Sequence, residues 1–464
     1  MKKKTKITLC LIFMFLLTST LLLGQHNGPK PLSEKQDYPL PTADYNLLIR
    51  NINIVDTETG DIFPNMNVFC AEGKIKQISS NPIQVPKDVM VVDGTNQYLT
   101  PGYLNMHMHV ADEPDAHQIS QELLSYGITG YRQMSGSYEL LESFNAGEFS
   151  TSTNEAAMLT MPIDIMTPMF APTAESAKEF VDTQKAEGAP FIKSGGVTAD
   201  VFFSALEEAQ QMGLRVEGHI LPDVDLKEAS QKGVYCVDHF GINHGALISC
   251  STDEASLRAI SSTLPAKVFQ NPLFVTAMKS DILRDFANEE LIGWATKNSG
   301  GATDPALLNG LIETFSEEKA RELAITFREN DTWQCPTMVR MRSGNFEETD
   351  EITAAKVQSL YNRLVKIYEE EHVKMIAGTD GCIPSSLHDE FDELDMAGLE
   401  PLTVLQMVTI NGAEFLNMTD TLGSINEGKN ADMVILAANP LEDIQNLHKI
   451  NGVIRAGEYH PFVQ

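Results

Sequence analysis

Residues 99–110 of this 464-residue chain read LTPGYLNMHMHV, an apolar run that ends in two histidines separated by one residue. In an extended strand, residues two positions apart point to the same face, so His107 and His109 can direct both imidazoles toward one metal ion. A single HxH pair is also compatible with two structural or surface histidines. The stretch therefore predicts a buried strand whose end carries a candidate metal site.

Further short apolar runs follow this stretch and alternate with segments that show the apolar spacing of helices, such as ADVFFSALEEAQQMG. The runs are ITGYRQM, AAMLTMPI, FIKSG, LRVEGHI, VYCVDHF, TWQCPTMV and KMIAGTD. Strands and helices that alternate in this way are typical of a (β/α)8 TIM barrel in the α/β class. Residues 101–417 provide the length that such a barrel needs.

Four of these runs end in residues that can carry chemistry, namely Lys193, His219, His239 and Asp380. Taken one at a time, they could be a lysine paired with an acid, two hydrogen-bonded core histidines and a turn aspartate. Barrel enzymes, however, place their active sites at the carboxyl ends of the strands. All of these side chains would meet the HxH pair there, so the pattern predicts one shared metal site.

The two ends of the chain are rich in β-branched residues and in Gly or Asn turns, which predicts short hairpins. We expect residues 45–100 and 418–464 to form a small composite β-sandwich domain beside the barrel. Residues 25–44 are rich in proline and polar residues and are expected to be a linker. The segment 242–330 is too long for one βα connection, and its apolar spacing predicts a helical insertion that shapes substrate access.

Residues 1–24 combine Lys2, Lys3, Lys4 and Lys6 with an apolar run over residues 7–17. This layout is typical of a secretory signal peptide with cleavage after Gly24, and an uncleaved N-terminal anchor is the alternative. We therefore expect a periplasmic or secreted protein that is not stably inserted in a membrane after cleavage.

The chain is strongly acidic, with 34 Lys and Arg against 64 Asp and Glu and a formal net charge of −30. Nucleic-acid binding is therefore not expected, because phosphate contacts need Lys and Arg. Six cysteines, of which Cys10 lies in the predicted signal, are too widely spaced for a disulfide framework or a CxxC metal site. Buried free thiols are expected, with one disulfide bridge as the alternative.

Together these motifs resemble the amidohydrolase superfamily in its binuclear form, and more narrowly the imidazolonepropionase-like and prolidase-like amidohydrolases. LTPGYLNMHMHV is similar to the PGxxDxHxH opening of that family, and APFIKSGG, LRVEGHI and VYCVDHF are similar to its later strands. KMIAGTDGC and LGSINEGKNADMVILAANPLEDI extend the resemblance to the C-terminal part. Two positions depart from the family pattern, because Asn105 stands where Asp is usual and Asp238 where Glu is usual.

The resemblance implies two divalent metal ions, with zinc favoured and Mn or Fe as alternatives. The implied ligands are His107, His109, Lys193, His219, His239 and Asp380. The first two histidines and Asp380 would bind one ion, and the other two histidines would bind the second. Lys193 would be carboxylated, and its carbamate would bridge both ions. A single ion held by His107, His109, His219 and Asp380 is the alternative if this lysine is not carboxylated.

The resemblance also implies a metal-dependent hydrolase that cleaves C–N bonds, amide or peptide, of small substrates by attack of a metal-bound hydroxide. Asp380 would accept the proton and deliver it to the leaving nitrogen. A dipeptidase is the favoured activity, and a lactonase or organophosphate triesterase is the alternative among enzymes. A non-catalytic binding protein on the same barrel is the alternative from another class. A homo-oligomer is expected by analogy with relatives.

Three residues are weaker candidates for substrate contacts. Arg132 follows the second run and Arg340 the seventh, and either guanidinium could bind a substrate carboxylate through two hydrogen bonds. A salt bridge to one of the many acids is the alternative for both. His388 follows the eighth run and could contact substrate or simply cap the next helix.

Overall fold

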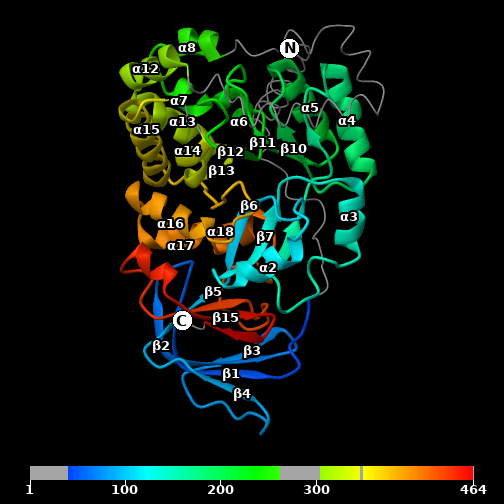
Figure 1. Cartoon of the computed structure of the whole chain (residues 1–464), viewed down its shortest axis with the longest axis vertical. Coiled ribbons are helices and arrows are strands. Elements are labelled where there is room, and N and C mark those ends of the chain that lie inside the picture. Colours follow the sequence, from blue (N-terminus) through cyan, green and yellow to red (C-terminus); the bar gives the residue numbers. More distant parts are fainter. Residues whose placement is uncertain (1–39, 262–303, 345–348, 463–464) are drawn as a thin grey trace, which may run out of the picture.

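The computed structural model describes residues 40–261, 304–344 and 349–462. The predicted signal peptide 1–24, most of the predicted linker 25–44 and the middle of the predicted insertion 242–330 lie outside the described residues. Within the described ranges, strands occupy both ends of the chain, and strands alternate with helices between them (Figure 1).

A mixed, eight-stranded sheet joins the two ends of the chain. It contains β1 (Leu47–Val55), β2 (Ile62–Ala71), β3 (Lys74–Ser79), β4 (Met90–Asp93), β5 (Tyr98–Pro101), β14 (Met433–Leu436), β15 (Ile450–Arg455) and β16 (Glu458–Pro461). The strand order is β16-β15-β14-β5-β1-β2-β3, and β4 pairs with β1. Strand β14 lies antiparallel to β5, with Met433 opposite Pro101. The ends therefore share one sheet, while a separate β-sandwich domain with the expected bounds stays a prediction.

A buried arginine fastens this sheet to the rest of the molecule. The Arg455 guanidinium contacts Asp432 Oδ1 at 3.0 Å and donates to the backbone carbonyls of Ser150 and Glu155. Because these two residues lie in the segment that leads into β8, hydrogen bonds hold the sheet against that part of the molecule.

Two sets of parallel strands form the centre of the remaining fold. The first contains β6 (Tyr103–Met108), β7 (Ile128–Gln133) and β8 (Ala157–Thr160) in the order β6-β7-β8. The second contains β9 (Ile165–Met166), β10 (Phe191–Gly195), β11 (Arg215–His219), β12 (Cys236–Asp238) and β13 (Trp333–Cys335) in the order β13-β12-β11-β10-β9. Parallel bridges from Met375 to Gln334 and from Gly381 to Met108 place residues 375–381 between β13 and β6.

The α/β class with parallel sheets is confirmed. The first seven predicted runs each contain a strand, whereas KMIAGTD forms only isolated bridges, and the two-residue strand β9 was not expected. The parallel strands follow the order β8-β7-β6, then residues 375–381, then β13 to β9. In the described ranges no ladder joins β8 to β9, so closure into a complete barrel stays a prediction.

Helices flank the parallel strands in Figure 1. They are α2 (Ala116–Leu124), α3 (Tyr138–Asn145), α4 (Ala174–Ala186), α5 (Ala199–Gln211), α6 (Leu226–Gln231), α14 (Met338–Gly344), α15 (Glu351–Glu370), α16 (Ser386–Met396), α17 (Pro401–Met407) and α18 (Ile410–Phe415), with the 3-10 helix η1 (Ile444–His448) near the C-terminus. Their starts follow capping rules. Helix α4, for example, begins with a capping box in which Thr173 and Ser176 bind each other's backbone N–H.

The described parts of the predicted insertion are helical. They contain α7 (Gly245–Ser249), α8 (Glu254–Ser261), α12 (Pro305–Thr314) and α13 (Glu317–Glu329). Helix α12 starts with Pro305 in its first turn, and the Asp304 side chain accepts hydrogen bonds from the first free N–H groups. Residues 262–303 lie outside the described residues, so the role of the segment in substrate access stays a prediction.

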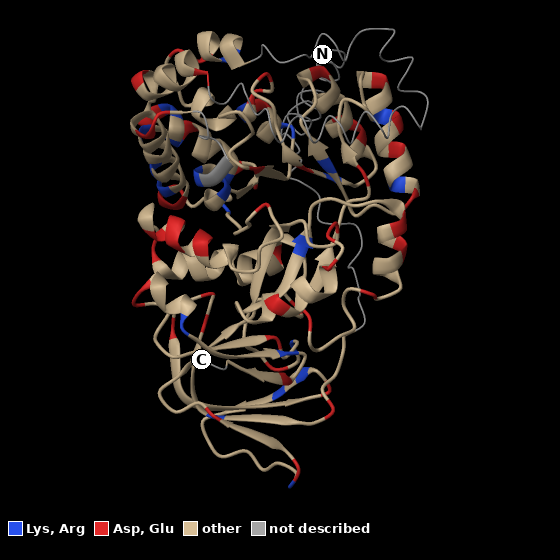
Figure 2. Cartoon of the chain, in the orientation of Figure 1, with Lys and Arg blue, Asp and Glu red and all other residues tan. Residues whose placement is uncertain are grey.

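Acidic side chains are spread over most helices and are interspersed with Lys and Arg (Figure 2). No described helix is both long enough and apolar enough to cross a membrane. In the same residues all five cysteines, Cys70, Cys236, Cys250, Cys335 and Cys382, are free thiols, and the first four are buried. The expectation of free thiols is therefore confirmed for the described chain.

Candidate metal centre

The carboxyl end of β6 is held rigidly against residues 379–380. Every residue of β6 is buried. Asn105 donates from Nδ2 to Thr379 Oγ1 at 3.0 Å and accepts the His107 N–H at 3.3 Å through Oδ1. The Asp380 N–H in turn donates to the His107 carbonyl at 2.9 Å. Asn105 thus ties together two predicted metal ligands although it lacks the charge of the usual Asp.

The Asp380 carboxylate lies among three of the predicted histidine ligands. Its Oδ1 is 2.9 Å from His107 Nε2 and 3.2 Å from His109 Nε2. Its Oδ2 is 3.6 Å from His239 Nε2. The donor atoms of His107, His109 and Asp380 all lie within 4.8 Å of one another, so small side-chain movements would let them share one ion.

His219 and His239 form a second group beside the first. Their rings lie 5.0 Å apart between centroids, and the His239 ring lies 4.7 Å from that of His107. The Nδ1 atom of His239 is 2.5 Å from Thr337 Oγ1, which leaves its Nε2 atom facing the site. The structure therefore brings together all four of the histidines that the sequence singled out.

Several ring nitrogens in this cluster are buried without a hydrogen-bond partner of acceptable geometry. Among the described residues these atoms are Nδ1 and Nε2 of His107 and the Nε2 atoms of His219 and His239. Buried polar atoms are nearly always satisfied, so such a group points to a missing partner. Imidazole nitrogens and a carboxylate are the ligand set that zinc and related divalent ions prefer. The residues present therefore fit a metal site.

Lys193 ends up beside the histidines, as its place at the end of β10 predicts. Its Nζ atom is buried and lies 2.6 Å from Asp238 Oδ2. Gly218 makes room for this side chain, because a Cβ atom at that position would lie 2.7 Å from Lys193 Cδ, and its φ of +113° also favours glycine. Carboxylation of Lys193 stays a prediction.

Arg132 does not face the space above the metal ligands. Its side chain is fully buried, its Nε donates to the Met106 carbonyl at 2.5 Å, and its Nη1 lies 2.6 Å from Glu217 Oε2. The prediction that Arg132 binds a substrate carboxylate is therefore corrected in favour of the salt-bridge alternative. Burial of a guanidinium requires such a partner, and here the partner is an acid on β11.

Arg340 lies directly at the site. Its Nε contacts Asp380 Oδ2, and its side chain is 33% exposed. It sits on α14, whose first N–H groups, from Met338 and Val339, donate to the buried Glu390 carboxylate at 3.0 and 2.8 Å. Of the two predicted arginines, this is the one placed where a substrate could reach it.

His388 has a packing role in the structure. Its Nε2 lies 3.1 Å from the Tyr126 carbonyl oxygen, and its ring packs against Phe391 and His448. These contacts hold α16 against η1, and a substrate contact of His388 stays a prediction.

The protonation of the buried histidines agrees with a ligand role. Burial, reinforced by the charge of Lys193, lowers the pKa of His219 well below its usual value. Burial, reinforced by the charge of Arg340, does the same to the pKa of His239. Both rings are therefore neutral near neutral pH, which is the state that binds a metal ion.

His109 and Asp380 are shifted by their charged neighbours. Burial lowers the pKa of His109, but hydrogen bonds to Asp112 and Asp380 outweigh it and raise that pKa to about 9. Burial raises the pKa of Asp380, but the charge of Arg340 outweighs it and holds that pKa well below the usual range. An ion that binds here would have to displace the His109 proton, as metal binding generally does.

Sequence reasoning missed several supporting residues. Ser135 Oγ lies 2.6 Å from His109 Nδ1 and also contacts Asp112. Thr337 and Thr379 support His239 and Asn105. Ser135 and Thr337 each lie two positions after a strand end, which is the signal that could have identified them.

Comparison with known proteins adds family evidence. Residues 315–459 match the model of the amidohydrolase family. The chain is 21% identical over 423 residues to an adenine deaminase of Clostridium botulinum (strain Loch Maree / Type A3), which is 89% of this chain and 56% of that protein. It is also 33% identical over 91 residues to a 5-methylthioadenosine/S-adenosylhomocysteine deaminase of Teredinibacter turnerae, which is 17% of this chain and 20% of that protein.

The resemblance to the amidohydrolase family is confirmed. A hydrolase that acts on carbon–nitrogen bonds is what this resemblance implies. The chain spans about half the length of the curated adenine deaminase that it matches, at 56%.

Solved structures of amidohydrolases have a similar fold. A Xaa-Pro dipeptidase with methionine bound in its active site has a TM-score of 0.60 at 18% identity, over 90% of this chain and 100% of that chain. A putative prolidase from Bifidobacterium longum has a TM-score of 0.59 at 19% identity, over 90% and 95%. At such identities the likeness establishes a shared fold and no shared substrate.

Proposed function

We propose that the protein is a metal-dependent hydrolase that cleaves amide or peptide bonds of small substrates, with dipeptides as the favoured class. One observation carries the proposal. Ring nitrogens of the buried His107 and His239 lack hydrogen-bond partners and lie beside one carboxylate, Asp380, where parallel strands end. The carboxyl ends of parallel strands are where α/β enzymes bind ligands and place catalytic groups.

The proposed donors fall into two sets that share Asp380. The ligands are His107, His109, Lys193, His219, His239 and Asp380. Zinc suits this set of nitrogen and oxygen donors, and Lys193 would join the two sets as a carbamate. When bound, the ions would supply Lewis acidity that activates a water molecule and polarises the scissile carbonyl.

Asp380 would move the proton. Its Oδ1 faces His107 and His109, whereas its Oδ2 faces His239 and the partly exposed Arg340. Oδ2 therefore lies on the open side of the cluster, where it can take a proton from the attacking water and pass it to the leaving nitrogen.

Arg340 supports the choice of peptide substrates. Its guanidinium is at the site and partly exposed, and it already binds one carboxylate, that of Asp380. Arginine recognises carboxylates through paired N–H groups, so the same side chain can bind the free carboxylate of a dipeptide. Lactones and phosphate triesters lack such a group.

The test compares dipeptides that have a free carboxylate with the same peptides capped as C-terminal amides, using the full chain loaded with zinc. A charged hydrogen bond is worth about 1.5–3 kcal/mol. We expect the amides to have a KM about 10–100-fold higher. Arg340→Met should remove this difference and act mainly on KM. The matched control is Arg342→Met on the same helix, whose guanidinium is mostly exposed and pairs with Glu393.

Two results would contradict the proposal. Faster hydrolysis of lactones or paraoxon-like esters than of any peptide would assign the site to the lactonase or triesterase alternative. Absence of hydrolysis in every class, together with absence of bound metal, would favour a non-catalytic binding protein.

We propose in addition that the parallel strands close into a (β/α)8 barrel and that the chain is exported by its N-terminal segment. The strand order supports the first proposal. The basic and apolar composition of residues 1–24 supports the second. By analogy with relatives, we also propose that the protein is a homo-oligomer and that its substrate is a small molecule.

A further inference from the structure

Asp238 is an acid that lies beside the histidine cluster and contacts several of its neighbours. It ends β12 and is fully buried. Its Oδ2 lies 2.6 Å from Lys193 Nζ and 3.3 Å from His107 Nδ1. Its Oδ1 lies 3.6 Å from both Cys236 Sγ and Arg132 Nη2. Both carboxylate oxygens are therefore occupied by groups of the protein.

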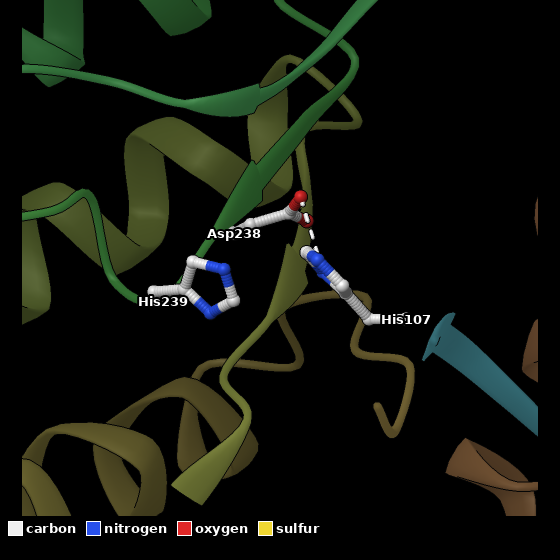
Figure 3. A group of neighbouring side chains, drawn as sticks. All are labelled: His107, Asp238 and His239. Atoms are coloured by element: carbon white, nitrogen blue, oxygen red, sulfur yellow. Dashed lines mark ion pairs between the residues drawn. The ribbon is translucent and has the colours of Figure 1, made fainter. Parts of the chain in front are cut away.

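The position of Asp238 relative to His107 is specific. The two ring nitrogens of His107 face different acids. Nδ1 lies 3.3 Å from Asp238 (Figure 3), whereas Nε2 lies 2.9 Å from Asp380. The 3.3 Å contact does not have hydrogen-bond geometry here, but a carboxylate beside Nδ1 favours the proton on that nitrogen and leaves the lone pair of Nε2 for an ion. Asp238 thus sets the tautomer that a metal ligand needs.

Asp238 could instead be a ligand itself, because its donor atoms lie within 4.8 Å of those of His107 and His239. To face an ion, however, its carboxylate would have to leave Lys193 and Arg132. Both of these side chains are buried, and a buried N–H group that loses its acceptor is unfavourable. A carboxylated Lys193 keeps one N–H on Nζ, which can donate to the same oxygen, so the contact survives either state of the lysine.

We propose that Asp238 is a positioning residue that orients His107 and Lys193 for metal binding without touching the metal. The inference rests on the proposed function, since it presumes a metal at His107. In this proposal Asp238, at the end of a strand, supplies the carboxylate support for the metal ligands. Asn105 cannot supply it, because its side chain is uncharged.

Glu217 provides a matched control. It is also a buried acid of the same cluster, but its contact is Arg132 Nη1 at 2.6 Å. Asp238→Asn and Glu217→Gln both replace a buried carboxylate by its amide. Only the first change removes the negative charge that faces His107 and Lys193.

The experiment uses the full chain and measures zinc affinity by chelator competition, with the visible spectrum and stoichiometry of bound cobalt(II) as a second readout. Loss of an outer partner typically costs about 10–100-fold in metal affinity. Asp238→Asn should show this loss and an altered cobalt spectrum at unchanged stoichiometry. Glu217→Gln should stay within about threefold of the wild type if its role is confined to Arg132.

Three outcomes would overturn the inference. They are unchanged affinity and spectrum in Asp238→Asn, an equal loss in Glu217→Gln, or the loss of one whole cobalt ion in Asp238→Asn, which would make Asp238 a ligand. If the wild type binds no zinc or cobalt, the proposed function fails as well, so the two failures are distinguishable.

If Asp238→Asn does not fold, a measurement on the wild-type protein tests the inference instead. Long-range proton–nitrogen correlation spectra of the zinc-loaded, histidine-labelled chain report the tautomer of each ring, and His107→Gln identifies the signal of His107. The inference expects the proton on Nδ1 and the metal on Nε2. The opposite tautomer would contradict it.

Discussion

Replacing Asp380 with asparagine is expected to lower kcat by at least about 10²-fold, because an amide cannot accept the proton of the attacking water. The charge of Arg340 holds the pKa of Asp380 well below the usual range despite its burial, so the group is an ionised carboxylate near neutral pH and has no proton of its own. Single-turnover hydrolysis of a dipeptide at saturating zinc measures the effect on the chemical step.

Saturating zinc matters in this experiment because the introduced amide would also be a weaker ligand than the carboxylate. The control is Asp392→Asn, whose carboxylate lies on α16 beside His448. It should keep normal turnover. Turnover of Asp380→Asn near that of the wild type, with zinc bound, would remove Asp380 from the chemical step.

Replacing Lys193 with alanine is expected to remove most of the activity. A ligand that bridges both donor sets should matter at least as much as an outer partner, whose loss costs about 10–100-fold. Added acetate, propionate or bicarbonate should restore part of the activity, because a small carboxylate can fill the space left by the side chain and bridge the ions.

The control for this rescue is Lys227→Ala, which removes a partly exposed lysine that pairs with Glu322 on the outer surface. It should lose no activity and gain none from carboxylates. Since Lys193→Ala also removes a buried partner of Asp238, circular dichroism must show that the variant is folded. Full activity with unchanged metal content would mean that Lys193 is no bridge and that the site holds one ion.

The sequence predicts much of the site because strand periodicity is a local property. His107 and His109 are two positions apart on one strand, and His219, His239 and Asp380 each follow an apolar run. Parallel strands carry their carboxyl ends to one side, so local patterns predict a common location. The same reasoning identified the first seven of the predicted runs as strands.

The partners of buried charges could not be predicted in this way. Arg132 pairs with Glu217, 85 residues further along the chain, and Lys193 pairs with Asp238, 45 residues further along. Such pairs depend on which strands become neighbours and in which register. An arginine in a buried strand indicates that some acid must be near it, but not which one.

The eighth predicted run does not form a regular strand, and the reason lies in its own residues. KMIAGTD contains Gly378, where a Cβ would lie 2.6 Å from His107 Cβ, and Asp380, whose φ is 54°. The close approach at Gly378 and the left-handed backbone at Asp380 bring the Asp380 side chain to the other ligands. As a result, this segment does not pair as a regular strand. Local rules are most often broken where a site demands unusual backbone geometry.

The central claim is that this cluster of histidines and Asp380 holds metal ions in the working protein. Elemental analysis of the full chain, expressed with ample zinc and freed of loosely bound ions, tests the claim directly. A value of about one ion per chain would keep the metal site but remove the bridging role of Lys193. The account predicts about two ions per chain, and fewer than about 0.2 ions per chain would contradict it.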